Sequence, residues 1–292
     1  MDIQKQLVAV EASEEAPQIM SAARRIAQAS SSTPQCSVFC SVLPLQEFYP
    51  DVNYAPLSAY SADIMEQLKT SSCKHLKPYL QDHEKLVVRE GYPVHQIVEQ
   101  AHEMDLIVMG KHSRHGVKRL LGSTTLSVLN HCDSNLLAVQ VGESSNPGEY
   151  QRVLMAVDTT DSSGPVVEQG SSLQCQDHYV VSVVPPINSV YANIYGDFDF
   201  GDNLHSIAQD LRSQIHLQTQ TLAAKHGINK DHVLICEGDA ADKIIDTAQE
   251  LNADLIVLAA NNRSALNRLL LGSTSRKVLN QAQCDVLVLR VD

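Results

Sequence analysis

Short runs of apolar residues alternate with amphipathic stretches along the chain. The runs are rich in Val, Ile and Leu and are as short as strands buried on both faces. In the first half they cover Leu7–Val10, Val38–Leu43, Leu86–Val88, Leu106–Met109 and Leu136–Val141. A stripe of apolar residues with helical spacing runs from Leu204 to Leu222, and Gly227 supplies a stop. Strands that alternate with such helices predict a parallel sheet covered on both faces.

This alternation occurs twice, because the second half of the sequence repeats the first. The matching segments are VAVE and MAVD at 8–11 and 155–158, SVLP and SVVP at 41–44 and 182–185, DLIVMG and DLIVLA at 105–110 and 254–259, and two copies of LLGST at 120–124 and 270–274. We therefore predict one duplicated domain, with copies at 1–143 and 150–292 joined by a segment rich in Gly, Ser and Pro. Each copy should be α/β, Rossmann-like and doubly wound, with five parallel strands and any ligand outside their carboxyl ends.

The charge balance limits the classes of partner. With 22 basic and 34 acidic residues, the formal net charge is −12, which argues against general binding of nucleic acid or of an anionic membrane. No apolar run approaches the roughly 18–20 residues of a membrane span. The chain enters a strand-like run directly after Met1, and its seven cysteines lack framework spacing. We therefore expect a cytoplasmic protein with reduced thiols and no signal peptide.

Two long segments carry a family resemblance. EGYPVHQIVEQAHEMDLIVMGKHSRHGVKRLLGSTTLSVLNHCDSNLLAVQV and GDAADKIIDTAQELNADLIVLAANNRSALNRLLLGSTSRKVLNQAQCDVLVLRV each resemble the C-terminal half of a universal stress protein domain. With VAVE and MAVD at the first strands, the whole chain is similar to tandem universal stress proteins. The resemblance implies two such domains paired as a pseudo-dimer, with the apolar edge strands Leu136–Val141 and Val286–Val291 as the joint.

The ATP-binding branch of that family carries a glycine pattern after the fourth strand: Gly, two residues, Gly, nine residues, then Gly-Ser or Gly-Thr. Glycines let the backbone approach phosphates, and a helix N-terminus favours an anion. An acid ending the first strand binds the nucleoside, and a residue of the second strand recognises adenine through its backbone. The residues that this implies are Glu11, Val42, Gly110, Ser113, Gly122, Ser123 and Thr124 in the first half, and Asp158, Val183, Ala259, Asn262, Gly272, Ser273 and Thr274 in the second. The predicted ligand is ATP or a related adenine nucleotide, with or without a divalent cation.

Neither copy matches this pattern fully. The first half has Ser113 in place of the second Gly, and its Gly122 comes one residue early. The second half has Ala259 and Asn262 in place of two glycines. We expect the first half to hold the nucleotide, because Gly110 lets the ligand approach and four cations precede the helix. These cations are Lys111, Arg114, Lys118 and Arg119.

Other interpretations stay open. Gly followed by Ser or Thr as N-cap is also an ordinary way to begin a helix, and the basic loop is then a solvated loop. The aromatic-rich segments 45–60 and 187–200 suit an apolar pocket, an interface or plain loop packing. No residue set has the spacing of a metal site or of a catalytic triad, so we predict no enzyme. The alternative function is an interaction protein that uses the fold as a scaffold or binds an apolar ligand, and a homodimer of the tandem chain is compatible with either.

Overall fold

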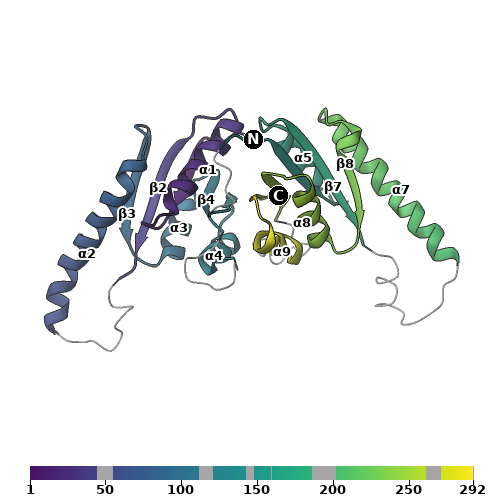
Figure 1. Ribbon diagram of the computed structural model, residues 1–292. Coiled ribbons are helices and arrows are strands. Elements are labelled where there is room, and N and C mark those ends of the chain that lie inside the picture. Colours follow the sequence, from purple (N-terminus) through teal and green to yellow (C-terminus); the bar gives the residue numbers. More distant parts are fainter. Residues whose placement is uncertain are drawn as a thin grey trace. The chain divides into compact units, whose positions relative to one another are not determined.

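The computed structural model describes residues 1–44, 55–111, 121–142, 148–158, 160–185, 202–260 and 271–291. The chain divides into two compact units, built mainly from Asp2–Gly148 and from residue 149 onwards. Each unit is an α/β domain, and Figure 1 shows the same elements recurring along the sequence in both. The predicted fold class, two tandem Rossmann-like domains with parallel sheets, is confirmed.

In the first half, five parallel strands form a sheet in the order β3-β2-β1-β4-β5. Right-handed crossovers then place α1 and α2 on one face and α3 and α4 on the other, where α3 packs against α4. A short 3-10 helix, Lys77–Tyr79, follows α2. The elements are β1 (Lys5–Ala9), α1 (Ala16–Ala29), β2 (Gln35–Val42), α2 (Ala55–Leu76), β3 (Glu84–Glu90), α3 (Pro93–Ala101), β4 (Leu106–Gly110), α4 (Ser123–His131) and β5 (Asn135–Val139).

The second half has the same topology, with the strand order β8-β7-β6-β9-β10. The predicted long helix forms α7, and Gly227 follows it with φ +74°, a conformation that favours glycine. A 3-10 helix, Lys230–His232, precedes β8. The elements are β6 (Arg152–Val157), α5 (Ser163–Ser171), β7 (Asp177–Val184), α7 (Asp202–Lys225), β8 (Val233–Glu237), α8 (Ala240–Glu250), β9 (Leu255–Ala259), α9 (Ser273–Gln281) and β10 (Asp285–Leu289).

The central strands explain why the sequence shows continuous apolar runs. In β4, Leu106, Ile107 and Val108 are completely buried, and Leu255, Ile256 and Val257 of β9 are equally buried. A strand covered by helices on both faces needs apolar side chains at every position, so alternation disappears.

An aspartate begins the DLIV segment of each half and has the same structural role in both. Asp105 Oδ2 accepts the amides of Gln4 and Lys5 at 2.9 and 2.8 Å. Asp254 Oδ2 accepts those of Gln151 and Arg152 at 2.8 and 2.9 Å. Each carboxylate therefore joins the start of the fourth strand to the start of the first, which fixes the relative position of the two strands whose other ends bound the candidate site.

Candidate functional site

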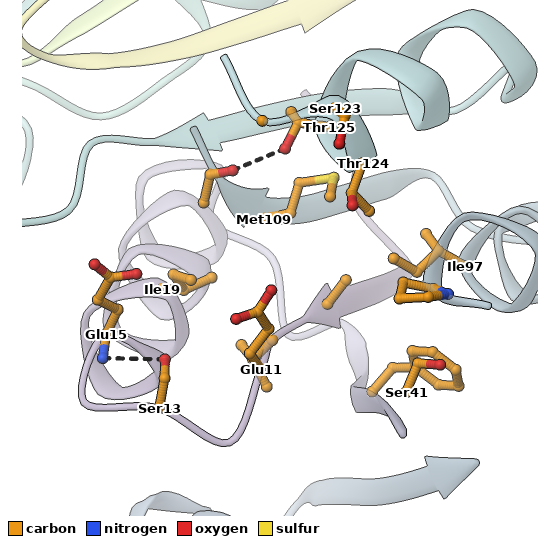
Figure 2. A pocket seen from close by; sticks show the side chains of 16 residues that line it. Glu11, Ser13, Glu15, Ile19, Ser41, Ile97, Met109, Ser123, Thr124 and Thr125 are labelled. Atoms are coloured by element: carbon orange, nitrogen blue, oxygen red, sulfur yellow. Dashed lines mark hydrogen bonds between the residues drawn. The ribbon is translucent and has the colours of Figure 1, made fainter. Parts of the chain in front are cut away.

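A cavity of about 120 Å³ lies at the carboxyl end of the first sheet. Its walls come from the ends of β1, β2 and β4 and from the first turns of α1, α3 and α4, with Glu11 on the chain after β1 and Ser123–Thr125 on α4 (Figure 2). Ligand sites usually measure roughly 300–1,000 Å³, so the described walls enclose only part of the volume that a nucleotide fills. Five of the seven residues predicted for this half line the cavity: Glu11, Gly110, Gly122, Ser123 and Thr124.

The two Gly-Ser-Thr segments begin helices, as predicted, but without a side-chain cap. Gly122 is the N-cap of α4 and Gly272 is the N-cap of α9, and neither helix has a side-chain capping hydrogen bond. The interpretation that Ser or Thr is the N-cap is therefore wrong. Within the described part of the chain, the amides of Ser123 and Thr124 donate to no acceptor. These open amides, together with the positive end of the helix, suit an anion.

A hydroxyl that the sequence analysis missed connects each of these helices to the preceding strand. Thr125 Oγ1 donates to the carbonyl of Gly110 at 2.9 Å, as Figure 2 shows. In the second half, Ser275 Oγ donates to the carbonyl of Ala259 at 3.1 Å. The available signal was the recurrence of Thr or Ser three residues after the glycine in both copies of LLGST.

The acids that end the first strands differ in their surroundings. Glu11 is exposed at the cavity, and its carboxylate has no partner among the described residues. Asp158 Oδ1 instead accepts the amide of Thr160 at 2.8 Å, and it also accepts the hydroxyls of Thr160 and Ser163. Ala16 takes the place of Ser163 in the first half, which leaves Glu11 without that donor.

The backbone of the second strand corrects one predicted residue. Val10 donates its amide to the carbonyl of Phe39, so the backbone of Phe39 faces β1. Backbone direction alternates along a strand, so Ser41 faces the same side, beyond the end of β1, and lines the cavity. Val42 faces β3, and its carbonyl accepts the amide of Gly91 at 2.9 Å. The backbone that the strand turns toward the cavity is therefore that of Ser41, and not that of the predicted Val42.

The corresponding register in the second half supports this correction. The carbonyl of Val184 accepts the amide of Gly238 at 3.1 Å, as that of Val42 accepts the amide of Gly91. Val184 is thus the counterpart of Val42, and Val183 is the counterpart of Ser41. Aligning SVLP with SVVP by their identical residues pairs Val42 with Val183. The hydrogen bonds of the strands show that the structural pairing is shifted by one residue.

The predicted basic loop also needs correction at its first residue. Lys111 is completely buried, and its amide donates to the carbonyl of Val139 at 2.9 Å. It is therefore not a cation on the rim of the cavity. Arg114, Lys118, Arg119 and the predicted site residue Ser113 lie outside the described residues, as does Asn262 in the second half.

The second half carries an ion cluster between α8 and α9. Lys277 Nζ lies 3.1 Å from Asp239 Oδ1 and 2.7 Å from Asp242 Oδ1. The amide of Asp242 and then the Lys277 ammonium lower the pKa of Asp239, the N-cap of α8. The corresponding residues of the first half are Tyr92, the N-cap of α3, with His95 and Ser127, so this cluster belongs to one half alone.

The described residues contain neither a metal-binding cluster nor a helix that could span a membrane. No group of three or more His, Cys, Asp or Glu side chains there is arranged to hold a metal ion. None of the helices found there has the length and apolar content needed to cross a membrane.

Comparisons with known proteins agree on one family. The sequence profile of the universal stress protein family matches residues 3–140 and 149–290. Universal stress protein A homolog 2 of Coxiella burnetii is 29% identical over 146 residues, which are 49% of this chain and 96% of that protein. Universal stress protein E homolog of Haemophilus influenzae is 28% identical over 169 residues, 55% of this chain and 53% of that protein. A solved universal stress protein from Archaeoglobus fulgidus covers 98% of this chain and 96% of its own, with a TM-score of 0.65 and 16% identity.

Proposed function

Since the chain belongs to the universal stress protein family, we propose that it acts in a stress response by binding an adenine nucleotide of the ATP type in its first half. The observation that carries this proposal is the pairing of groups around the first-half cavity. Glu11, whose carboxylate has no partner among the described residues, lies at one wall, and the open amides of α4 lie at another. A carboxylate suits the hydroxyls of a ribose, and open amides at a helix N-terminus suit a phosphate.

The backbone of Ser41 and the apolar side chains of Ile19, Ile97 and Met109 complete the described walls. Backbone groups without a backbone partner among the described residues, at a strand end beside apolar side chains, suit a flat base, because its edge needs hydrogen bonds and its faces need apolar contact. A base, a sugar and a phosphate thus each find a matching surface around one cavity.

The second half is less suited to the same ligand. Ala259 places a Cβ at the strand end where Gly110 has none. The carboxylate of Asp158 is engaged by its own loop, through the amide of Thr160 and the hydroxyl of Ser163. Both differences disfavour a ribose at this strand end, so we assign the nucleotide to the first half, with one molecule per chain.

One objection to the first half is the residue missing before Gly122. The hydroxyl bond of Thr125 to the end of β4 answers it, because Ser275 makes the same bond after a loop one residue longer. The first turn of α4 therefore keeps the same contact with the end of its fourth strand as the first turn of α9.

Isothermal titration calorimetry with ATP tests the proposal. We expect one site per chain in the wild type, lost in Gly122→Val, where a branched side chain enters the cavity, and kept in the matched variant Gly272→Val. Loss of binding only in Gly272→Val would place the site in the second half. No binding of ATP, ADP or AMP by the wild type would refute the proposal and favour an interaction protein that works without nucleotide.

A further inference from the structure

We propose that Thr125 is a positioning residue, whose hydroxyl sets the place of the open α4 amides and so the affinity of the site for phosphate. The inference rests on the proposed nucleotide site, and it adds a residue outside the glycine pattern and the strand-end acid. Thr125 is 3% exposed, and its Oγ1 lies 2.9 Å from the carbonyl oxygen of Gly110.

Two hydrogen bonds hold the start of α4 to the end of β4. The first joins the hydroxyl of Thr125 to Gly110, and the second joins the amide of Gly122 to the carbonyl of Lys111 at 2.8 Å. A buried hydroxyl that lost its acceptor would carry a desolvation penalty, so the Thr125 bond resists a shift of the helix away from the strand.

The identity of the N-cap makes the hydrogen bond of Thr125 important. A Ser or Thr at an N-cap accepts a hydrogen bond from the amide of the second or third helical residue. Gly122 has no side chain to do so, and the hydroxyl of Thr125 donates away from the helix, to the end of β4. The helix is thus fixed in place without using the amides of Ser123 and Thr124, which bind no acceptor in the described part of the chain and stay available for a ligand.

The second half indicates that the hydroxyl, rather than the length of the preceding loop, sets the position of the helix. Ser275 makes the equivalent bond to Ala259 with a sequence separation of 16 residues, whereas Thr125 and Gly110 are separated by 15. Ser275 is also buried, with 6% exposure. The same contact therefore forms after loops of different length, which indicates that the hydroxyl determines where the helix begins relative to the strand.

The test compares ligands with and without phosphate. Calorimetry with adenosine, AMP and ATP is carried out on the wild type and on Thr125→Val, which keeps the shape of the side chain and removes the hydroxyl. We expect Thr125→Val to weaken AMP and ATP by about tenfold, as for loss of about one hydrogen bond, and to leave adenosine within about twofold. Thr125→Ser should restore the wild-type affinities, because Ser275 makes the same bond in the other half.

Ser275→Ala is the matched control, since it removes the same hydroxyl from the half without nucleotide, and it should leave all three affinities unchanged. Equal weakening of adenosine and ATP in Thr125→Val would show a general packing role and overturn the inference. Unchanged affinities in that variant would also overturn it, while nucleotide binding by the wild type would still stand. If the wild type binds none of the three ligands, both the site and the role of Thr125 are refuted.

Discussion

Replacing Gly170 by Ala should destabilise the second half, because the new methyl group would collide with Met155. Gly170 lies on α5, and a Cβ built there would be 2.5 Å from both Cγ and Sδ of Met155. Met155 lies on β6 and is completely buried, so its side chain has no solvent to move into. Overpacking of this kind costs about 1–3 kcal/mol. Ala gains about 1 kcal/mol over Gly in a helix interior, so the expected net loss is up to about 2 kcal/mol.

The first half suggests how this loss can be recovered. Ala23 on α1 and Val8 on β1 occupy the places of Gly170 and Met155, and both are buried. One half thus pairs a larger helix residue with a smaller strand residue, and the other half does the reverse. Met155→Val alone should cost about 1–2 kcal/mol through a cavity, whereas in Gly170→Ala/Met155→Val the new methyl group fills that space.

Urea unfolding followed by circular dichroism, with a separate transition fitted for each domain, measures the effect. The double variant should be at least about 1 kcal/mol more stable than the sum of the two single changes predicts. Gly164→Ala is the control, because it lies on the same helix and a Cβ there meets nothing within 4 Å. A Gly170→Ala protein as stable as the control, with additive effects in the double variant, would refute the packing argument.

Two further predictions concern acid stability and chemistry. Burial raises the pKa of Glu84, but the hydrogen bonds from Arg24, at 2.8 and 2.7 Å, and from the amide of Gln81 outweigh it and leave that pKa lowered. The stabilisation is therefore present above the ordinary glutamate pKa of 4.5 and is lost as the pH falls through the lower folded value, so Arg24→Met should lower the urea midpoint more at pH 7 than at pH 3. We also expect no appreciable hydrolysis of ATP; phosphate release well above background that Ser123→Ala abolishes would contradict this.

Most of the fold could be predicted from the repeated sequence, because apolar runs and helix-starting residues are local signals. Apolar runs located the five strands of the first half, and the repeated segments carried that prediction to the second half. The two LLGST copies located the first turns of α4 and α9. Which groups line the site depends instead on the direction in which each residue faces, and this is harder to predict from the sequence. The backbone of Ser41 rather than that of Val42 faces the cavity, because the direction of the backbone groups alternates along a strand. Comparing the two copies of the sequence does not show which residues face which side.

Two other features of the site depend on contacts far apart in the sequence. Lys111 is buried by packing in the folded chain. From the sequence alone, its charge predicted an exposed residue of the loop. The role of Thr125 depends on a carbonyl 15 residues earlier, beyond a segment whose length differs between the halves. Neither follows from composition or spacing, and both concern how the end of one element meets another.

The aspartates that join the first and fourth strands have a consequence for synthesis on the ribosome. Asp105 binds amides 101 and 100 residues earlier in the chain, and Asp254 binds amides 103 and 102 residues earlier. Contacts between residues so far apart in the sequence slow folding, because the chain between them loses entropy before the contact forms. The central strand of each sheet therefore waits, with one edge open, until its fourth strand has left the exit tunnel. The last strand of the first half, Asn135–Val139, is synthesised before any strand of the second half. The two halves therefore expose an unpaired central strand one after the other, and not at the same time.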